Sequence, residues 1–366
     1  MNKNISFFGL MVFFICFTYK ADAQKIRKYS NEFLNIGVGG SAMGVANTRT
    51  STANDLYSFY YNPAGLTSVK DVFQLGYMHS EYFAGVAKYD YFGAAVPIDT
   101  TRTIGFSFIR FGIDDIPNTL FLFEPDGSIN YNNITKFTVA DYAVYLSYAQ
   151  KINKVRGLSV GGNVKVIHKN VGPFAKAWGF GIDLGLKYDY KKWHFGLMAK
   201  DITSTYNAWS FNFTDEEQAV LVQTNNEIPS NSVELTAPSI NLGASYTFDI
   251  KNKFFIEPML DFNVTTDGKR NVLFRTSPLA IDARFGLELN YAKIVYLRTG
   301  IGNFQWEDLG NDKEALRFQP SLGVGVNIKN WFYVDYAFTN IGNKEIFYSH
   351  VISAHFALQK KPQKNI

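Results

Sequence analysis

This sequence contains a single cysteine, Cys16, which lies in an apolar stretch near the N-terminus. The chain beyond that stretch therefore offers no disulfide, thiol nucleophile or iron–sulfur ligand. No run of about twenty apolar residues follows it, so we expect no helix there to cross a bilayer. The formal net charge of +4 is small and no basic stripe follows a recognition element, which argues against nucleic acid as a partner.

Catalytic and metal-binding patterns are missing as well. The five histidines are scattered, and His350 and His355, five residues apart, fall on opposite faces of a strand and make a poor metal pair. Acidic pairs such as Asp114-Asp115 lie in expected loops, and no Ser-His-Asp series has a nucleophile elbow. We therefore expect no enzymatic activity, no catalytic residue, no cofactor and no metal site.

The N-terminus has the pattern of a secretory signal peptide. Lys3 supplies the basic region, residues 7–17 form the apolar region, and Ala21-Asp22-Ala23 provides the small-residue cleavage site before Gln24. A transmembrane anchor would need a longer apolar span. We therefore expect residues 1–23 to be a signal peptide.

Aromatic residues are abundant, with 33 Phe and 22 Tyr, and many occur where apolar and polar residues alternate. In residues 177–190, Trp178, Leu184 and Tyr190 fall on one face, while Asp183 and Lys187 fall on the other. The strands of a soluble β-protein also show this alternation of apolar and polar residues. These segments, however, are about ten to thirteen residues long, the length of a tilted strand that crosses hydrocarbon. Aromatic residues also gather near the ends of the apolar rows, as in an interfacial girdle. We favour a transmembrane barrel.

The alternating segments predict an all-β, antiparallel transmembrane β-barrel of about fourteen strands over residues 71–358. The expected strands are 72–87, 89–97, 102–110, 137–150, 158–168, 177–190, 193–200, 238–250, 254–264, 280–291, 294–302, 316–328, 331–339 and 348–358.

The connections between these strands alternate in length along most of the chain. Short links at 98–102, 151–157, 189–192, 251–253, 292–293 and 329–330 alternate with longer ones at 111–136, 169–176, 201–237, 265–279, 303–315 and 340–347. Outer-membrane barrels place tight turns in the periplasm and long loops outside. We therefore expect a bacterial outer-membrane location, contact with outer-membrane lipid, and both termini in the periplasm.

Charged residues on the polar faces should point into the barrel lumen, because ionised groups facing lipid cost several kcal/mol, about 2–4 for Arg or Lys at the midplane. They are Asp183, Lys187, Asp282, Arg284, Glu288 and Asp335. Their mixed signs favour mutual pairing and pairing with backbone over a solute path or a docking pocket. Pro258 is the best candidate for a break in the wall, because proline cannot donate to the ladder.

Lysines recur in the short turns, at Lys151, Lys154, Lys191, Lys192, Lys251, Lys253, Lys293 and Lys329. Solubility and turn propensity are the simpler interpretation. The alternative is a basic rim that meets anionic head groups or an acidic partner.

Residues 24–70 differ from the rest, because they are rich in small residues and show no sustained alternation. We expect them to fold into the lumen as a hatch, since small residues let backbone pack closely. Two pieces carry a resemblance: Asn31-Glu32-Phe33-Leu34-Asn35-Ile36-Gly37, continuing to Gly44, and Tyr60-Tyr61-Asn62-Pro63-Ala64-Gly65-Leu66. They resemble the PorV/PorQ family of the FadL-like outer-membrane barrels.

The resemblance implies a fourteen-stranded barrel behind an N-terminal hatch and a role in type IX secretion in Bacteroidota. The implied partners are the secretion translocon and the C-terminal domains of exported cargo proteins. The chain departs from the simplest pattern at its end, where a basic tail, residues 359–366, follows the last strand instead of a terminal aromatic residue.

Three functions stay open from the sequence. The leading hypothesis is a PorV-like binding barrel of the type IX pathway that holds cargo or translocon partners. The alternative is a FadL-like transporter of hydrophobic small molecules across the outer membrane, which requires an apolar pocket under the loops. No constellation of residues supports the third, an outer-membrane enzyme.

Overall fold

The computed structural model describes residues 30–70, 72–124, 126–310, 313–339 and 349–358. The expected signal peptide, residues 1–23, and the basic tail, residues 359–366, lie outside the described residues. Among the described residues, no helix combines the length and the apolar character needed to cross a membrane.

Fourteen antiparallel strands form a closed barrel, as the alternation predicts, and the ring closes where Phe73 of the first strand pairs with Leu358 of the last. The strands of the ring are β1 (Phe73–Tyr82), β2 (Ala87–Pro97), β3 (Arg102–Asn118), β4 (Thr135–Lys151), β5 (Leu158–Val171), β6 (Ala175–Tyr190), β7 (Trp193–Lys200), β10 (Ser239–Tyr246), β12 (Phe254–Thr265), β14 (Ala280–Tyr291), β15 (Val295–Asp308), β16 (Glu314–Ile328), β17 (Phe332–Thr339) and β18 (Ser349–Leu358).

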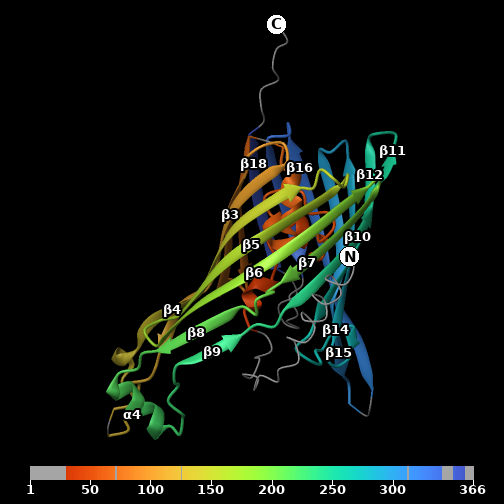
Figure 1. The fold of residues 1–366 in the computed structure, drawn as a ribbon. Helices are drawn as coiled ribbons and strands as arrows, with labels where there is room; N and C mark the ends of the chain where they lie inside the picture. Colours follow the sequence, from red (N-terminus) through yellow and green to blue (C-terminus); the bar gives the residue numbers. More distant parts are fainter. Residues whose placement is uncertain (1–29, 71, 125, 311–312, 340–348, 359–366) are drawn as a thin grey trace, which may run out of the picture.

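The barrel has two unlike ends (Figure 1). At one, which we call the short-turn end, β2 meets β3, β4 meets β5 and so on through tight turns, and β18 stops at Leu358. At the other, the loop end, strands β3 to β6 run past the rest of the barrel, and the wall projects on one side. The long link expected at 169–176 is wrong, because β5 and β6 extend into it and leave only residues 172–174 between them.

The link at 201–237 is long but regular in part. It contains β8 (Tyr206–Phe211), α4 (Asp215–Gln223) and β9 (Ser232–Leu235), and β8 continues the wall by pairing with the first half of β6. Thr214 and Glu217 form a reciprocal capping box at the start of α4, which fixes that helix end. Two short strands, β11 (Phe248–Ile250) and β13 (Phe274–Arg275), complete the sheet.

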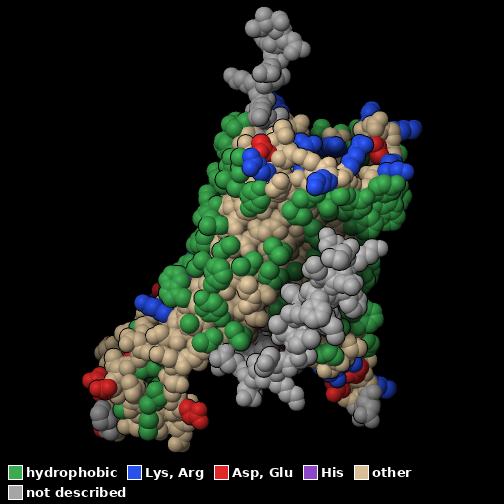
Figure 2. Space-filling view, viewed as in Figure 1, with side chains coloured by type: hydrophobic (Ala, Val, Ile, Leu, Met, Phe, Trp, Pro, Cys, Tyr) green, Lys and Arg blue, Asp and Glu red, His purple; other side chains and the backbone are tan. Residues whose placement is uncertain are grey.

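Side chains on the wall follow the expected alternation. Leu184 is 50% exposed on the outer face of β6, whereas its neighbour Asp183 is 2% exposed on the inner face. Large apolar side chains are exposed on the outside along most strands, and they form the hydrophobic surface seen over the wall (Figure 2). A folded protein in water rarely exposes so much contiguous apolar surface, and a bilayer accounts for it.

Residues 30–70 lie inside the barrel, where the red and orange ribbon winds between the walls (Figure 1). We call them the hatch segment. Its short elements are a 3-10 turn at Glu32–Asn35, α2 (Gly40–Met43), α3 (Ser58–Tyr61) and a second 3-10 turn at Pro63–Ser68. The main apolar core joins the aromatic residues of this segment to inward side chains of β1 to β5 and of β17 and β18. The core of the molecule is therefore the contact between the hatch segment and the wall.

Candidate functional site

The residues of the hatch motif hold the hatch segment in place. Gly37 has a positive φ of 112°, and Asn47 occupies the space that a side chain there would need. Asn62 donates to the carbonyl oxygens of Thr50, at 2.9 Å, and of Leu186 on β6, at 2.8 Å. Gly65 packs against the backbone of Ala53. The asparagine thus joins two parts of the hatch segment to the wall.

The remaining motif residues lie at other points of the same segment. Asn31 and Phe33 are buried, and the Asn31 side-chain oxygen accepts a hydrogen bond from Asn207 of β8 at 3.0 Å. The Pro63 ring packs against Gly185 on β6 of the wall. At Gly44, a side chain would meet the α-carbon of Gly323 on β16 at 2.9 Å. Small residues on both sides therefore allow backbone to approach backbone.

A buried charge cluster fastens the hatch segment to one side of the wall. Glu288 of β14 accepts from Arg49 of the hatch segment at 2.8 Å and from Arg298 of β15 at 2.7 Å. Arg298 also reaches Asp335 of β17 at 2.5 Å. All four side chains are at most 11% exposed, so each ion is paired where water is scarce.

The other lumen-facing charges named from the sequence are also inside the barrel. Asp183 pairs with Lys165 at 2.8 Å, and Lys187 donates to the carbonyl oxygen of Ala53 at 3.0 Å. Asp282 and Arg284 are neighbours on the inner face of β14, 3.3 Å apart. These contacts are structural, because each joins wall to wall or wall to hatch segment.

Pro258 interrupts the hydrogen-bonded ladder but leaves the strands in one register. Ser245 pairs with Met259 on one side of the gap and Phe248 with Ile256 on the other, so the interruption separates β10 from β11 without shifting β12. On its other edge β12 pairs with β14 throughout, with Pro258 opposite Leu287. A missing amide donor accounts for the split.

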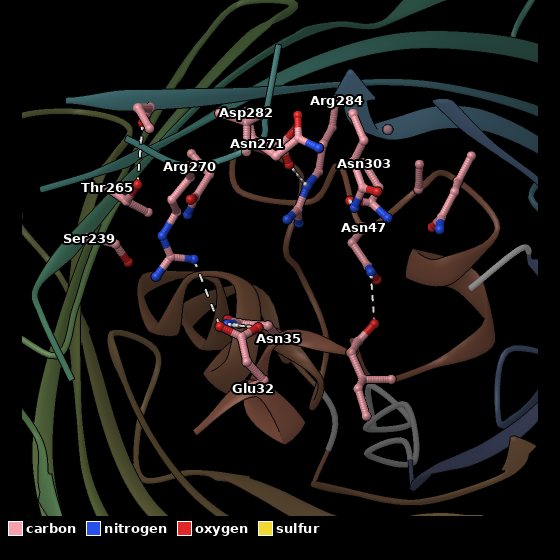
Figure 3. Close-up of a pocket in the computed structure, with 18 of the residues that line it drawn as sticks. Glu32, Asn35, Asn47, Ser239, Thr265, Arg270, Asn271, Asp282, Arg284 and Asn303 are labelled. Atoms are coloured by element: carbon pink, nitrogen blue, oxygen red, sulfur yellow. Dashed lines mark hydrogen bonds and ion pairs between the residues drawn. The ribbon is translucent and has the colours of Figure 1, made fainter. Parts of the chain in front are cut away.

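A polar cavity of about 680 Å³ lies between the hatch segment and the loop-end halves of β10 to β17. Asn35 and Glu32 face it from the hatch segment, Arg284 and Asn303 from the wall, and Arg270 from the loop between β12 and β13 (Figure 3). Arg270 forms ion pairs with Asp267 at 2.5 Å and with Glu32 at 3.8 Å. We call this space the lumen cavity; its amides, carboxylates and guanidinium groups suit a polar ligand.

A second cavity, of about 820 Å³, lies in the projecting part of the wall at the loop end. Its lining is apolar and aromatic, and it comes from the β3–β4 hairpin, the β5–β6 turn, β8 and α4: Leu120, Phe123, Phe137, Phe174, Trp209, Phe211, Phe213, Val220 and Leu221. Phe174 packs edge-on against Phe137, with ring centres 5.2 Å apart, and stacks on Phe213 at 5.7 Å. We call this space the aromatic groove.

The aromatic groove faces the same way as the lumen. Along β8, Asn207 points inward to the hatch segment, and Trp209 and Phe211 follow it on the same face. Between the groove and the hatch segment stands Lys169, whose Nζ lies 5.9 Å from the ring centre of Trp209 and 5.7 Å from that of Phe33. Asp141 is 3.7 Å from the same ammonium. A charged pair therefore separates the apolar groove from the barrel interior.

Sequence reasoning did not find the aromatic groove, because its lining comes from four separate segments of the chain. Two signals were readable: residues 206–211 alternate as Tyr-Asn-Ala-Trp-Ser-Phe, and Thr214-x-x-Glu217 is a helix-start pattern. Both lie in residues 201–237, which we expected to be one long link between strands. The position of Phe137 and Phe174 beside them depends on the strand register.

The fold and its internal segment define a class: a closed barrel of fourteen antiparallel strands with residues 30–70 in its lumen. No protein-family model matches the chain, and no curated protein matches it. Solved structures with the same fold include the CymD monoaromatic hydrocarbon channel, with a TM-score of 0.54, 14% identity, and coverage of 89% of this chain and 98% of that one.

Two further structures agree. The Ralstonia pickettii toluene transporter TbuX matches with a TM-score of 0.52 and 10% identity, over 88% of this chain and 99% of its own. A Pseudomonas aeruginosa FadL homologue matches with a TM-score of 0.51 and 10% identity, over 88% of this chain and 98% of its own. The chain therefore has the FadL-like barrel fold, which it shares with a hydrocarbon channel and a toluene transporter.

Proposed function

We propose that this chain is a non-enzymatic outer-membrane barrel that captures hydrophobic molecules at its loop end. The observation that carries the proposal is the aromatic groove, whose volume of about 820 Å³ accommodates a ligand of fatty-acid or aromatic-hydrocarbon size. Apolar ligands bind such a surface because both surfaces leave water. The toluene and hydrocarbon channels that share the fold favour the same class of ligand.

The geometry favours capture over free passage. Below the groove, Lys169 and Asp141 form a charged pair, and the hatch segment beneath them packs against β1 to β5 with buried contacts. A hydrophobic molecule would have to displace paired charges to go further, which is costly in a dry interior. Passage to the short-turn end therefore requires the hatch segment to rearrange.

Binding of a hydrophobic fluorescent probe, dansyl-undecanoic acid, to the purified barrel tests the proposal. Phe211→Ser removes an aromatic ring from the groove, and Tyr206→Ser, on the outer face of the same strand, is the matched control. We expect Phe211→Ser to weaken binding about tenfold, since the loss of a buried ring contact is worth about 1–3 kcal/mol. Equal affinity of the two variants would contradict the proposal.

A second function is favoured by a different observation, the polar lining of the lumen cavity beside the hatch motif. Amide side chains such as those of Asn35, Asn263 and Asn303 can pair with the backbone of a peptide. Together with the resemblance of the hatch motif to the PorV/PorQ family, this supports a role in type IX secretion. The partners would be the C-terminal domain of a cargo protein and the translocon.

Deletion of the gene separates the two functions. Accumulation in the periplasm of proteins with a C-terminal sorting domain would support the secretion role, and normal secretion with lost uptake of a fatty acid or hydrocarbon would support transport. Complementation of the deletion with single variants then shows which cavity each function requires. Asn303→Leu in the lumen cavity should fail to restore secretion, and Phe211→Ser in the groove should fail to restore uptake.

A further inference from the structure

Cationic side chains encircle most of the short-turn end. Each turn from residues 152–157 to residues 329–331 carries at least one Lys or Arg, and together we call them the basic rim: Lys151, Lys154, Arg156, Lys191, Lys192, Lys251, Lys253, Lys293 and Lys329. In Figure 2 the blue side chains gather along this end, while acidic side chains stand out at the loop end around α4. The barrel therefore has a charge polarity along its axis.

These cations have no carboxylate partner among the described residues. Of the acidic residues at the same end, Asp99 pairs with Arg102 at 2.6 Å and Asp189 with His194 at 2.6 Å. Asp249 accepts the backbone N–H of Asn252 at 2.9 Å within its own turn. The basic rim therefore presents positive charge that the protein itself does not neutralise.

The rim sits directly beyond the lipid-facing aromatic residues. Tyr190, Trp193, Phe254, Tyr291 and Trp331 are each between 44% and 53% exposed, next to the turns that carry the cations. Aromatic girdles lie at the level of the head groups. The Nζ atom of Lys191 lies 5.3 Å from the ring centre of Tyr190, so this cation stays at that level.

We propose that the basic rim binds the phosphate groups of anionic phospholipids in the membrane leaflet at the short-turn end. The distribution of charge argues for lipid over a single acidic protein. The cations come from turns spread between β4 and β17, and a protein partner would cover one arc, whereas the head groups of a leaflet surround the whole barrel. Each Lys or Arg close to an anionic surface strengthens binding about fivefold.

Retention of lipid by the full chain tests the proposal. The barrel is placed in nanodiscs of equal phosphatidylcholine and phosphatidylglycerol, and native mass spectrometry counts the lipids that remain bound. The rim variant replaces Lys191, Lys192, Lys251 and Lys253 with Gln. The matched control replaces four loop-end lysines, Lys136, Lys176, Lys269 and Lys313, with Gln.

We expect wild type and the loop-end control to retain more phosphatidylglycerol than phosphatidylcholine. In the rim variant, the ratio of bound phosphatidylglycerol to bound phosphatidylcholine should be at least fivefold lower. If the rim variant does not assemble, wild type at about 0.5 M salt gives the same test, because salt screens exposed charges. Equal preference in rim variant and control, or no effect of salt on wild type, would overturn the proposal.

Discussion

The hatch segment meets the two sides of the barrel by different means. Toward β1 to β5 the contact is aromatic: Phe59 stacks on Tyr91 with ring centres 5.4 Å apart and packs edge-on against Tyr145 at 4.9 Å. Toward β14 and β15 it is ionic, through Arg49 and Glu288. Apolar contact stabilises the segment but is non-directional. Charged hydrogen bonds are directional and fix which residues of the segment and the wall meet.

The difference also explains where the lumen cavity lies. Polar side chains such as Asn263 and Arg284 line a space that apolar packing would have closed, and this cavity is on the ionic side. The aromatic groove, in contrast, continues from the wall of β3 to β6, on the aromatic side. The lumen cavity on the ionic side is therefore polar, and the aromatic groove on the aromatic side is apolar.

The largest expected effect comes from breaking the ionic side. Glu288→Gln leaves the buried guanidinium groups of Arg49 and Arg298 without their shared carboxylate, and the cost is about 3–5 kcal/mol. Urea unfolding in lipid vesicles measures it. The exposed pair Glu307–Arg317 provides the control, since Glu307→Gln should cost only about 0–1 kcal/mol. Similar losses in both variants would show that the cluster does not anchor the hatch segment.

Breaking the aromatic side should cost nearly as much but loosen a different region. Phe59→Ala removes a fully buried ring and should destabilise the protein by about 3–5 kcal/mol. Hydrogen exchange should then rise in residues 56–66 and stay low in residues 40–50, with the reverse in Glu288→Gln. Phe92→Ala, on the lipid-facing side of β2, is the control. Uniform exchange in both variants would refute two separate modes of contact.

Adjacent residues of β6 sharpen the comparison between the inside and the outside of the wall. Leu184→Arg places a charge in hydrocarbon at a cost of about 2–4 kcal/mol. Asp183→Asn should have the smaller effect, because Lys165 keeps Asp201 at 2.6 Å as a partner. The yield of each variant in outer-membrane fractions is the measurement, and equal yields would count against the assignment of the faces.

The smallest effect concerns alkaline pH. Burial raises the pKa of Tyr61 well above 10.0, because its hydroxyl is enclosed between Val38 and Asn47 of the hatch segment. A raised pKa in the folded state means that the stability it contributes is complete below about pH 10 and declines as pH rises further. Tyr61→Phe should therefore flatten the fall in melting temperature between pH 9 and pH 11, by about a few degrees. An unchanged slope would exclude this tyrosine as the cause.

Alternation along the chain was enough to predict the fourteen strands of the ring, since side chains of a strand point to opposite faces whatever its partners are. It was also enough to predict that Asp183, Glu288 and Asp335 point inward. It could not predict which charges meet: Arg49 and Glu288 are separated by 239 positions in the sequence, and the sheet register and the hatch segment bring them together. The groove was missed for the same reason, since Phe137, Phe174 and Trp209 converge only in the folded wall.

The most direct test of capture at the loop end is photocrosslinking with a diazirine-labelled fatty acid, followed by peptide mapping. We predict labels in the lining of the aromatic groove, in residues 117–137 of the β3–β4 hairpin and in residues 206–226 of β8 and α4. Unlabelled fatty acid should compete for these positions. Labels confined to the lipid-facing wall or to the lumen cavity, with none in the groove, would contradict the account.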